Sequence, residues 1–502
     1  MPIKIWLILL VCCILMTARC TSGKSGPVSG TGSNGGGGTS GPAAGPLQVD
    51  ARNPRYFNDS NGNIVYLTGS HTWFDLQDAG TTDPPPAFDF QQWLNFLQSR
   101  NHNFFRLWVW EQANWMLAAS QDIFIAPHPF QRTGPGMALD GKPKFDLTRF
   151  DQAYFDRMRQ RVIDAGQRGI YVSIMLFNGF SVEKSKGQSG LQNPWKGHPF
   201  NRNNNVNGID GDPNNNDSGE ETHTLQIPAI TTVQENYVRK VVDTVNDLNN
   251  VLYEISNESH SGSTAWQYHM IGLVKSYELG KPKKHPVGMT VEYPGGTNAE
   301  LFASPADWIS PNAGSENYYD DPQPADGRKV LLLDTDHLCG ICGDRNWVWK
   351  SFLRGGNPVF MDTYNSPPPG TTYDVNNPND VSLRANMGYA SAFARRISLA
   401  AMTPRSGLSS SGYCLANPSV AGAEYLVYIP TGGIVTVDLS GTSDTMSVEW
   451  LDPKSGNAYG AASVQGGAVR SFTPPFSGDA VLYIHGPKGT SPQAAPLKPR
   501  SS

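Results

Sequence analysis

Two stretches decide the fold: residues 251–258 read VLYEISNE and residues 330–337 read VLLLDTDH. Each begins as an apolar run with no polar alternation, which is typical of a strand buried on both faces of a parallel sheet. Each ends in carboxylate or amide side chains. Similar short runs occur on either side of these two, and we predict strands at 64–67, 103–110, 170–176, 286–290, 308–310 and 358–361.

Helical patterns lie between the predicted strands. Phe90, Trp93, Leu94 and Leu97 have the spacing of one helix face. Further helices are predicted around 155–163, 233–245, 266–277 and 385–402. Eight strands alternating with helices favour a (β/α)8 TIM barrel, with a doubly wound open sheet as the competing fold. No Gly-rich phosphate motif follows the first strand, which argues against a dinucleotide fold.

The ends of the chain differ in composition from its middle. Lys4 and the apolar run Ile5–Met16 predict a signal peptide or lipoprotein signal over 1–20, and hence a secreted or cell-surface protein. We expect the remaining segments to be a Gly/Ser-rich linker at 21–45, the barrel at 46–402, a small all-β sandwich at 403–486 and a disordered tail at 487–502. Asn201–Asp217 is a polar loop expected near the mouth of the barrel.

Charge and hydropathy narrow the function classes. The formal net charge is −5, so there is no excess of positive charge to bind nucleic acid. No apolar run after the first twenty residues is long enough to span a bilayer, so a membrane contact is expected only through an N-terminal lipid anchor. We predict no cofactor, and the oligomeric state stays open.

Acidic residues stand where two of the predicted strands end. Asn257 and Glu258 follow one strand, and Asp334, Asp336 and His337 follow another. The carboxyl ends of the strands form the active-site face of a barrel. Two carboxylates brought to one cavity can cleave a glycosidic bond, one as acid and one as nucleophile or base. A carbohydrate is therefore the predicted partner.

The segment Tyr253–Glu258 resembles the strand-four motif of the clan A glycoside hydrolases, such as family 5. The resemblance implies that Glu258 is the acid/base and that Asn257 binds the sugar 2-hydroxyl. Arg106 is similar to the strand-two arginine that supports the nucleophile in that clan. The stretch from Tyr413 to Ala480 resembles the collagen-binding-type β-domain that often follows such barrels.

The strand-seven acids depart from the family pattern, because the clan has Glu as nucleophile and this chain has Asp. Asp334 falls where that Glu is expected, and Asp336 lies two residues on, facing the same side if the strand continues. The shorter side chain could widen the carboxyl separation from about 5–5.5 Å toward the roughly 6.5–9.5 Å of inverting enzymes. By analogy we favour retention.

Other side chains at the strand ends are candidate substrate contacts. They are His71, Trp73, Trp108, Glu111, Asn178, Tyr318 and His337, with Asn257 and Arg106. Cys339 and Cys342 predict a local disulfide, and Cys414 a buried thiol. Two alternatives stay open: a degenerate barrel that binds glycan or matrix without catalysis, and a metal hydrolase using Asp334, Asp336 and His337, with zinc also conceivable beside the two cysteines.

Overall fold

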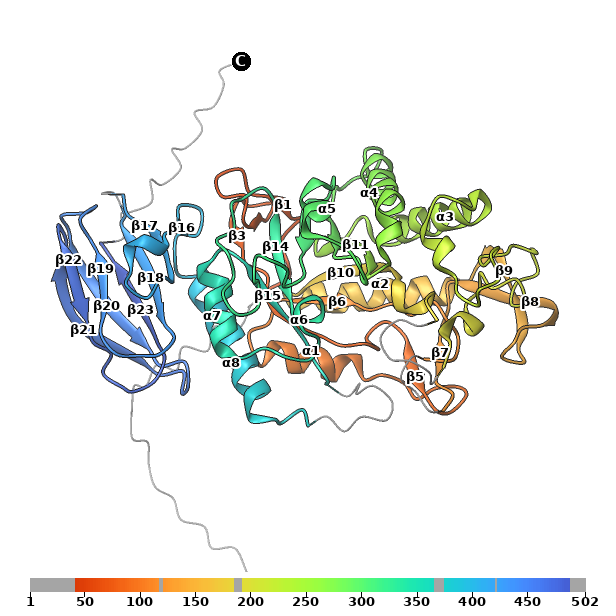
Figure 1. The fold of residues 1–502 in the computed structure, drawn as a ribbon, viewed down its shortest axis with the longest axis horizontal. Helices are drawn as coiled ribbons and strands as arrows, with labels where there is room; N and C mark the ends of the chain where they lie inside the picture. The colour runs from red at the N-terminus through yellow and green to blue at the C-terminus, as the bar shows by residue number, and fades with distance from the viewer. Residues whose placement is uncertain (1–40, 117–120, 185–191, 365–373, 420–421, 488–502) are drawn as a thin grey trace, which may run out of the picture. The chain divides into compact units, whose positions relative to one another are not determined.

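A computed structural model describes residues 41–116, 121–184, 192–364, 374–419 and 422–487. Its centre is a ring of eight parallel strands in chain order (Figure 1). A bridge between Thr72 and Leu107 joins the first strand to the second, so the ring closes and the doubly wound alternative is excluded. The strands are β4 (Gly69–His71), β6 (Phe104–Leu107), β10 (Tyr171–Asn178), β11 (Val251–Asn257), β12 (Val287–Thr290), β13 (Trp308–Ser310), β14 (Val330–Asp334) and β15 (Asn357–Met361).

The first barrel strand differs from the prediction. The apolar run 64–67 supplies β3 (Ile64–Val65) of a small antiparallel sheet with β1 (Gln48–Val49) and β2 (Phe57–Asn58). The barrel ladder begins only at Gly69, where an added Cβ would lie 2.0 Å from the carbonyl oxygen of Phe104. A glycine is therefore needed for the close approach of β4 to β6, and this requirement outweighs the stronger strand propensity of 64–67.

The helices follow the predicted apolar spacing. Asp89 and Asp151 cap the first turns of α1 and α2, and Pro228 begins α3. The last helix, predicted at 385–402, instead runs from Pro378 to Ala394. The helices are α1 (Phe90–Gln98), α2 (Gln152–Gln167), α3 (Pro228–Val245), α4 (Thr264–Glu278), α5 (Asn298–Ala303), α6 (Thr335–Leu338), α7 (Arg345–Leu353) and α8 (Pro378–Ala394). None of the helices in the described ranges is long and apolar enough to cross a membrane.

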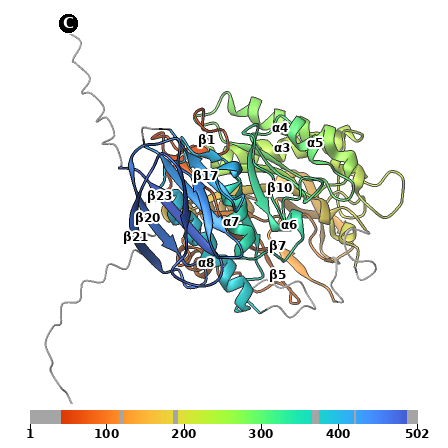
Figure 2. The same ribbon diagram turned by 60° about the vertical axis from the view of Figure 1, so that its left-hand side comes forward.

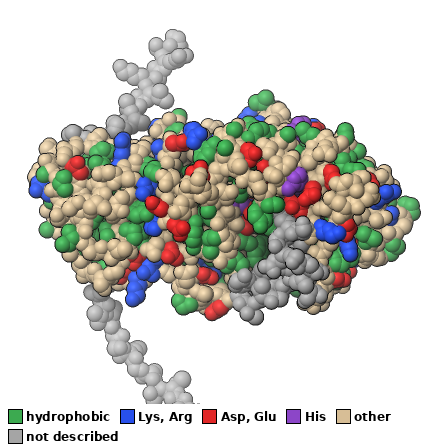
Figure 3. Space-filling model, in the orientation of Figure 1, with side chains coloured by type: hydrophobic (Ala, Val, Ile, Leu, Met, Phe, Trp, Pro, Cys, Tyr) green, Lys and Arg blue, Asp and Glu red, His purple; other side chains and the backbone are tan. Residues whose placement is uncertain are grey.

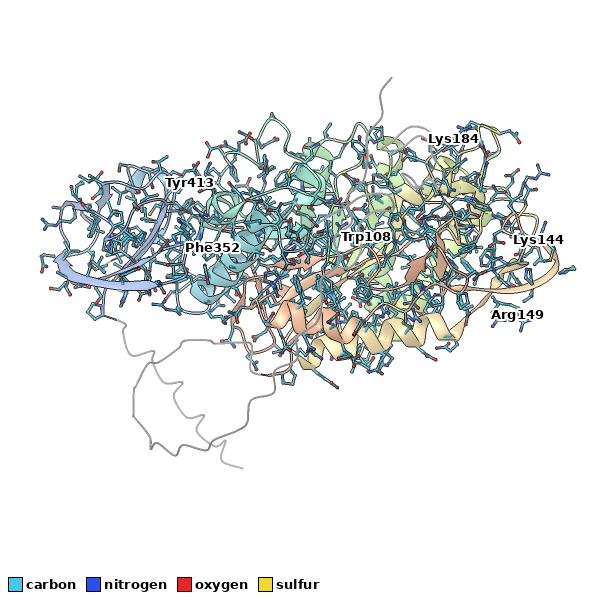
Figure 4. The ribbon with its side chains drawn as sticks, turned by 90° about the horizontal axis from the view of Figure 1, so that it is seen from below. Trp108, Lys144, Arg149, Lys184, Phe352 and Tyr413 are labelled. Atoms are coloured by element: carbon cyan, nitrogen blue, oxygen red, sulfur yellow. A yellow bond between two sulfur atoms is a disulfide. The ribbon has the colours of Figure 1, made fainter. Side chains whose placement is uncertain are left out.

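Insertions after the first three barrel strands enlarge the carboxyl-end face. β5 (Asp78–Gly80), from the segment after β4, pairs with β7 (Phe124–Ala126), and β8 (Phe130–Met137) pairs with β9 (Pro143–Phe150). Lys144 on β9 lies near the turn of that hairpin and Arg149 near its open end, where Phe150 pairs with Phe130 (Figure 4). The Asn-rich loop after β10 is packed through buried amides, because Asn204 and Asn205 donate to five carbonyl groups between them, those of 196, 198, 199, 201 and 209.

The chain enters the barrel at the amino-terminal end of its strands. The backbone N–H of Ala43 donates to the carbonyl of Gly166, just before β10 begins, and Leu47 is buried with the lowest layer of the barrel interior. Residues 41–45, which the sequence assigns to the linker, therefore belong to the packed structure. The predicted signal at 1–20, the rest of the linker, and residues 488–502 of the predicted tail lie outside the described residues.

The C-terminal domain is antiparallel. Its six-stranded sheet has the order β16 (Thr403–Pro404), β17 (Cys414–Asn417), β18 (Glu424–Ile429), β23 (Ala480–His485), β20 (Thr445–Leu451) and β21 (Ala458–Gln465). A two-stranded sheet of β19 (Val435–Asp438) and β22 (Val469–Phe472) completes it (Figure 1). The neighbouring strands β23, β20 and β21 are seen from another side in Figure 2. Cys414 is a buried free thiol, as predicted. These sheets confirm the expected small β-domain after the barrel.

The β-domain contacts α7 and α8 of the barrel. Arg345 on α7 pairs with the buried Asp479, which also accepts a hydrogen bond from Tyr428. Phe352 and Tyr413, labelled in Figure 4, lie on this side of the barrel. Asn386 of α8 donates to the carbonyl of Pro453. One apolar cluster includes residues of both parts, among them Trp349 and Tyr428, so the β-domain shares a core with the barrel.

Candidate active site

Arg106 organises the centre of the barrel at the carboxyl end of its strands. It lies on β6 and is 2% exposed. Its Nε and Nη2 donate to both oxygens of Glu254 at 2.8 and 2.6 Å, and Nη1 donates to Asp334 Oδ2 at 3.1 Å and Asp336 Oδ2 at 2.9 Å. Nη2 also donates to Asn257 Oδ1 at 2.6 Å. We call these five residues the Arg106 cluster; they bring the ends of strands two, four and seven to one point.

Asp334 is held more tightly than Asp336. Its Oδ1 accepts from His71 Nε2 and from the backbone N–H of Asp336, each at 3.0 Å, while Oδ2 accepts from Arg106. Burial alone would raise the pKa of Asp334, but His71 and Arg106 outweigh it and hold that pKa well below its ordinary value. Asp334 is therefore an ionised anchor that also caps α6.

Asp336 is in the first turn of α6 and shares Arg106 with Asp334. Among the described residues, its Oδ2 accepts from Arg106 and no hydrogen bond reaches its Oδ1. Burial raises the pKa of Asp336, Arg106 opposes this, and the neighbouring negative charge of Asp334 raises the pKa further. Asp336 is thus the more basic carboxylate of the two, with one oxygen available.

His337 is a neutral hydrogen-bonding residue. Its Nε2 lies 3.1 Å from Asn257 Oδ1 and its Nδ1 lies 2.7 Å from Ser310 Oγ. Because Asn257 Oδ1 only accepts, the network assigns the proton to Nε2 and makes Nδ1 the acceptor. Burial and the charge of Arg106 lower the pKa of His337 well below its ordinary value. Asn257 Oδ1 thus accepts two hydrogen bonds, from Arg106 and from His337. The buried Nδ2 of the same side chain has no acceptor in the described structure.

Glu258 follows Asn257 in a left-handed backbone conformation, with φ of +45°. Its N–H donates to Thr290 Oγ1 at 3.3 Å, and Thr290 in turn donates to the carbonyl of Ser256. An added Cβ on Gly179 would lie 2.4 Å from the carbonyl oxygen of Glu258, so the strand-three loop packs directly on this turn. A non-glycine residue with positive φ is uncommon and persists where the surroundings hold it.

A second buried group of polar side chains surrounds Glu111, which follows strand two. Glu111 Oε2 and Oε1 lie 3.3 Å from His198 Nε2 and His223 Nε2, and Oε1 accepts from the backbone N–H of Asn178 at 2.8 Å. His223 Nδ1 lies 2.9 Å from Ser259 Oγ. Burial would raise the pKa of Glu111, but the two imidazoles lower it to about 2. We call these five residues the Glu111 cluster.

The aromatic residues predicted to contact substrate do not all lie beside the acids. His71 stacks on Trp108 with ring centroids 5.5 Å apart, and Arg106 lies over the same indole, which Figure 4 places at the centre of the barrel. Trp73 is a buried neighbour whose carbonyl accepts from Trp110 Nε1. Tyr318 instead lines a cavity of about 530 Å³ with Phe302 and Leu331, outside the strand-seven wall. Residues 311–329, between β13 and β14, contain no helix, and this leaves the space.

The two cysteines after the strand-seven acids form the predicted disulfide, Cys339–Cys342, with Cα atoms 5.9 Å apart. In the described part of the chain, no group of three or more His, Cys, Asp or Glu side chains is arranged to hold a metal ion. The metal-hydrolase alternative therefore has no ligand set there. Acidic and histidine side chains are visible together on one face of the molecule in Figure 3.

Sequence reasoning missed the partners that come from loops. His198 and His223 lie in the long insertion after strand three, and no local motif links either to Glu111. Ser310 ends a three-residue strand, and Glu292 follows strand five after an unremarkable valine. The signal that could have found Glu292 is its position just after a predicted strand, which it shares with the other acids.

Comparisons with known proteins agree with this architecture. A family model described as "Domain of unknown function (DUF6298)" matches residues 124–293, and one described as "Putative collagen-binding domain of a collagenase" matches residues 411–484. The second match confirms the predicted resemblance of the C-terminal domain. No curated protein sequence matches the chain.

Solved structures with the same fold include glycoside hydrolases. A family 5 glycoside hydrolase from Bacteroides vulgatus ATCC 8482 is 14% identical, with 88% of this chain and 93% of that chain covered and a TM-score of 0.56. A structure described as a putative glycoside hydrolase from the same organism is 15% identical over 88% and 82%, with a TM-score of 0.54. A third, described as a glycoside hydrolase, is 13% identical, with 88% of this chain and 96% of that chain covered and a TM-score of 0.53. They confirm the predicted barrel with its β-domain.

Proposed function

We propose that the protein is an exported glycoside hydrolase acting on a polysaccharide or oligosaccharide. The observation that carries the proposal is the double role of Arg106, which hydrogen-bonds both to Asn257, the residue before Glu258, and to Asp336. One fixed cation thus joins the ends of the two strands that carry Glu258 and Asp336, at the active-site face of the barrel. The glycoside hydrolase structures that share the fold support the same class of reaction.

Glu258 is the acid/base in this proposal. Its carboxyl gives a proton to the leaving glycosidic oxygen as the bond to the anomeric carbon breaks. Asn257 Nδ2, a buried donor with no acceptor among the described residues, suits a hydroxyl of the sugar bound beside it. A donor left unpaired in the protein costs free energy unless a ligand or water pairs with it.

Asp336 is the nucleophile that the hydrogen bonds favour over Asp334. Its Oδ1 attacks the anomeric carbon and forms a glycosyl ester while the leaving group departs with the proton from Glu258. Water then attacks the anomeric carbon from the opposite face, Glu258 takes the water proton, and the bond between the anomeric carbon and Asp336 breaks. Asp334 has both oxygens engaged and keeps Arg106 and α6 in place. The outcome of this sequence is retention.

The test is hydrolysis of a glycan panel by the wild type and three variants. We expect Glu258→Gln and Asp336→Asn each to lose activity by about 10³-fold or more, with melting temperatures near that of the wild type. NMR of the first-formed anomer reports retention. An active wild type whose Glu258→Gln variant kept its activity would overturn the assignment of Glu258 as the acid/base. Loss with Asp334→Asn but not with Asp336→Asn would exchange the two strand-seven roles.

The substitution of Asp for Glu on strand seven keeps a second function under consideration. A shorter carboxylate is the specific observation that favours a barrel which binds glycan or matrix without turnover. Binding to a glycan array, unchanged in Glu258→Gln and without products from any glycan in the panel, would support that function over hydrolysis. Hydrolysis abolished by Glu258→Gln would exclude it.

A further inference from the structure

Glu292 is a buried carboxyl group that the proposed reaction does not use. It lies two residues after β12 and is 3% exposed. Three side chains at the start of α4 donate to it: Ser263 Oγ to Oε1 at 3.2 Å, Thr264 Oγ1 to Oε2 at 3.1 Å and Gln267 Nε2 to Oε1 at 3.4 Å. A carboxyl group with these partners faces the helix rather than a substrate.

The segment that Glu292 holds is the one that follows Glu258. The N–H of Tyr293 donates to the carbonyl of Ser259 at 3.0 Å, so the loop after strand five is joined to the residue next to Glu258. Gln267 also donates to Ser263 Oγ, which links the helix to the same turn. Glu258 therefore sits between two fixed points, the Thr290 hydroxyl before it and the Glu292 contacts after it.

The backbone at Glu258 explains why such a restraint matters. Its φ of +45° is a conformation that non-glycine residues leave readily unless their surroundings hold them. A general acid works only when its proton lies within hydrogen-bond reach of the leaving oxygen. Releasing the turn after Glu258 would let the backbone relax and carry the carboxyl group away from that oxygen.

We propose that Glu292 is a positioning residue for Glu258, acting by fastening the first turn of α4 to the loop after strand five. This inference rests on the proposed hydrolase function. Glu292 does not touch the substrate. Its role is to keep the strained turn after strand four in the one geometry in which Glu258 can protonate the leaving group.

The charge state of Glu292 indicates which substitution preserves this contact. Burial raises the pKa of Glu292 to about 7, the hydrogen bonds from α4 oppose this, and Glu300 of α5 adds to it; Tyr268 of α4 is another titratable group in its field. Glu292 is thus protonated more readily than an ordinary carboxyl group. Glutamine has the same shape and is neutral, and the hydroxyls of Ser263 and Thr264 can donate or accept, so Glu292→Gln should keep the turn in place.

The experiment compares two substrates of the wild type, the glycan that it hydrolyses best and the dinitrophenyl glycoside of the same sugar. A dinitrophenolate leaves without a proton, so a misplaced acid slows formation of the glycosyl ester from the glycan only, and kcat/KM reports that step. We expect Glu292→Ala to lower kcat/KM on the glycan by about ten-fold or more and to change kcat/KM on the aryl glycoside little. Glu292→Gln should stay close to the wild type on both.

Two further variants separate positioning from folding. Thr264→Val removes one donor and leaves Glu292 in place, so it should show the same selectivity with a smaller loss even if Glu292→Ala does not fold. Glu278→Ala removes another buried carboxylate, at the opposite end of α4, which accepts from Asn246, Tyr253 and His285. That control should lower stability while reducing both reactions equally.

The outcomes separate a failure of this inference from a failure of the proposed hydrolase mechanism on which it rests. If Glu258→Gln shows no selective loss on the glycan, the proposed acid/base role of Glu258, on which this inference rests, fails. If Glu258→Gln is selective while Glu292→Ala and Thr264→Val slow both substrates equally, or neither, then Glu292 is only a structural residue and the positioning role is wrong.

Discussion

The Arg106 cluster and the Glu111 cluster both lie at the carboxyl end of the barrel and both hold acidic side chains away from solvent, yet they balance charge in different ways. Arg106 is a permanent cation that touches three carboxylates. Glu111, the one carboxylate of its cluster, lies 3.3 Å from two imidazoles, and burial lowers the pKa of one of them, His223. The first cluster therefore contains a permanent cation, whereas the second contains none.

The origin of the partners differs as well. Every member of the Arg106 cluster lies on a barrel strand or in the turn after it, whereas His198 and His223 come from the insertion after strand three. A site built from strands is fixed by the backbone hydrogen bonds of the ring. A site that borrows from insertions depends on how those loops pack, so we expect its geometry to be the more easily changed of the two.

The largest expected effect comes from removing Arg106. Arg106→Met leaves Glu254, Asp334 and Asp336 buried without their cation, which should lower the free energy of unfolding by more than about 3 kcal/mol. Urea unfolding at pH 7 measures it. Arg396→Met, which breaks a largely exposed pair with Glu449, is the matched control and should cost about 1 kcal/mol or less. Equal losses would mean that Arg106 is not the centre of the first cluster.

The two aspartates of the Arg106 cluster should respond in opposite directions. The pKa of Asp334 is depressed, so its ionised form stabilises the fold above its ordinary pKa near 4 and that stability is lost as the pH falls. The pKa of Asp336 is raised, so its contribution is present at low pH and is lost as the pH rises. At pH 7, Asp334→Asn should cost about 1–3 kcal/mol, whereas Asp336→Asn should be neutral or stabilising. Melting temperatures at pH 7 would contradict this if the order were reversed.

A smaller effect is expected for Glu111. Its folded pKa of about 2 lies below its ordinary value of 4.5, so its stabilisation is present above pH 4.5 and disappears as the pH falls toward 2. Wild type should therefore exceed Glu111→Gln by on the order of 1–3 kcal/mol at pH 6, with the two curves converging in acid. Thermal unfolding across that range tests it. Parallel curves would show that the imidazoles do not hold Glu111 ionised.

The smallest expected effect concerns the disulfide after the strand-seven acids. Cys339 and Cys342 close a very short loop, for which chain-entropy arguments give about 2 kcal/mol at most. Cys339→Ser with Cys342→Ser should lower the melting temperature slightly and leave the Arg106 hydrogen bonds in place, so hydrolysis should persist. Loss of all activity in a folded double variant would show that the loop, and not only Arg106, positions Asp336.

Sequence patterns predicted the parts of the molecule that obey simple periodicity. The buried strands were found because they are short apolar runs, and Asp334 and Asp336 because they end such a run. The first barrel strand was misplaced because Ile64–Val65 has the stronger propensity but pairs in another sheet. Strand β21 gives no strand signal in the sequence, because nearly all its residues are exposed and carry no apolar alternation. Tyr318, predicted in the site, lines a separate cavity because no helix follows strand six.

The attachment of Ala43 to the barrel floor has a consequence for how the molecule faces its surroundings. The chain arrives at the amino-terminal rim of the strands, where Ala43 bonds to Gly166, and Arg106 lies toward the opposite rim. Any anchorage upstream of Gly41 would therefore be joined to the folded part at the amino-terminal rim, and the acids around Arg106 would lie on the side away from that attachment point.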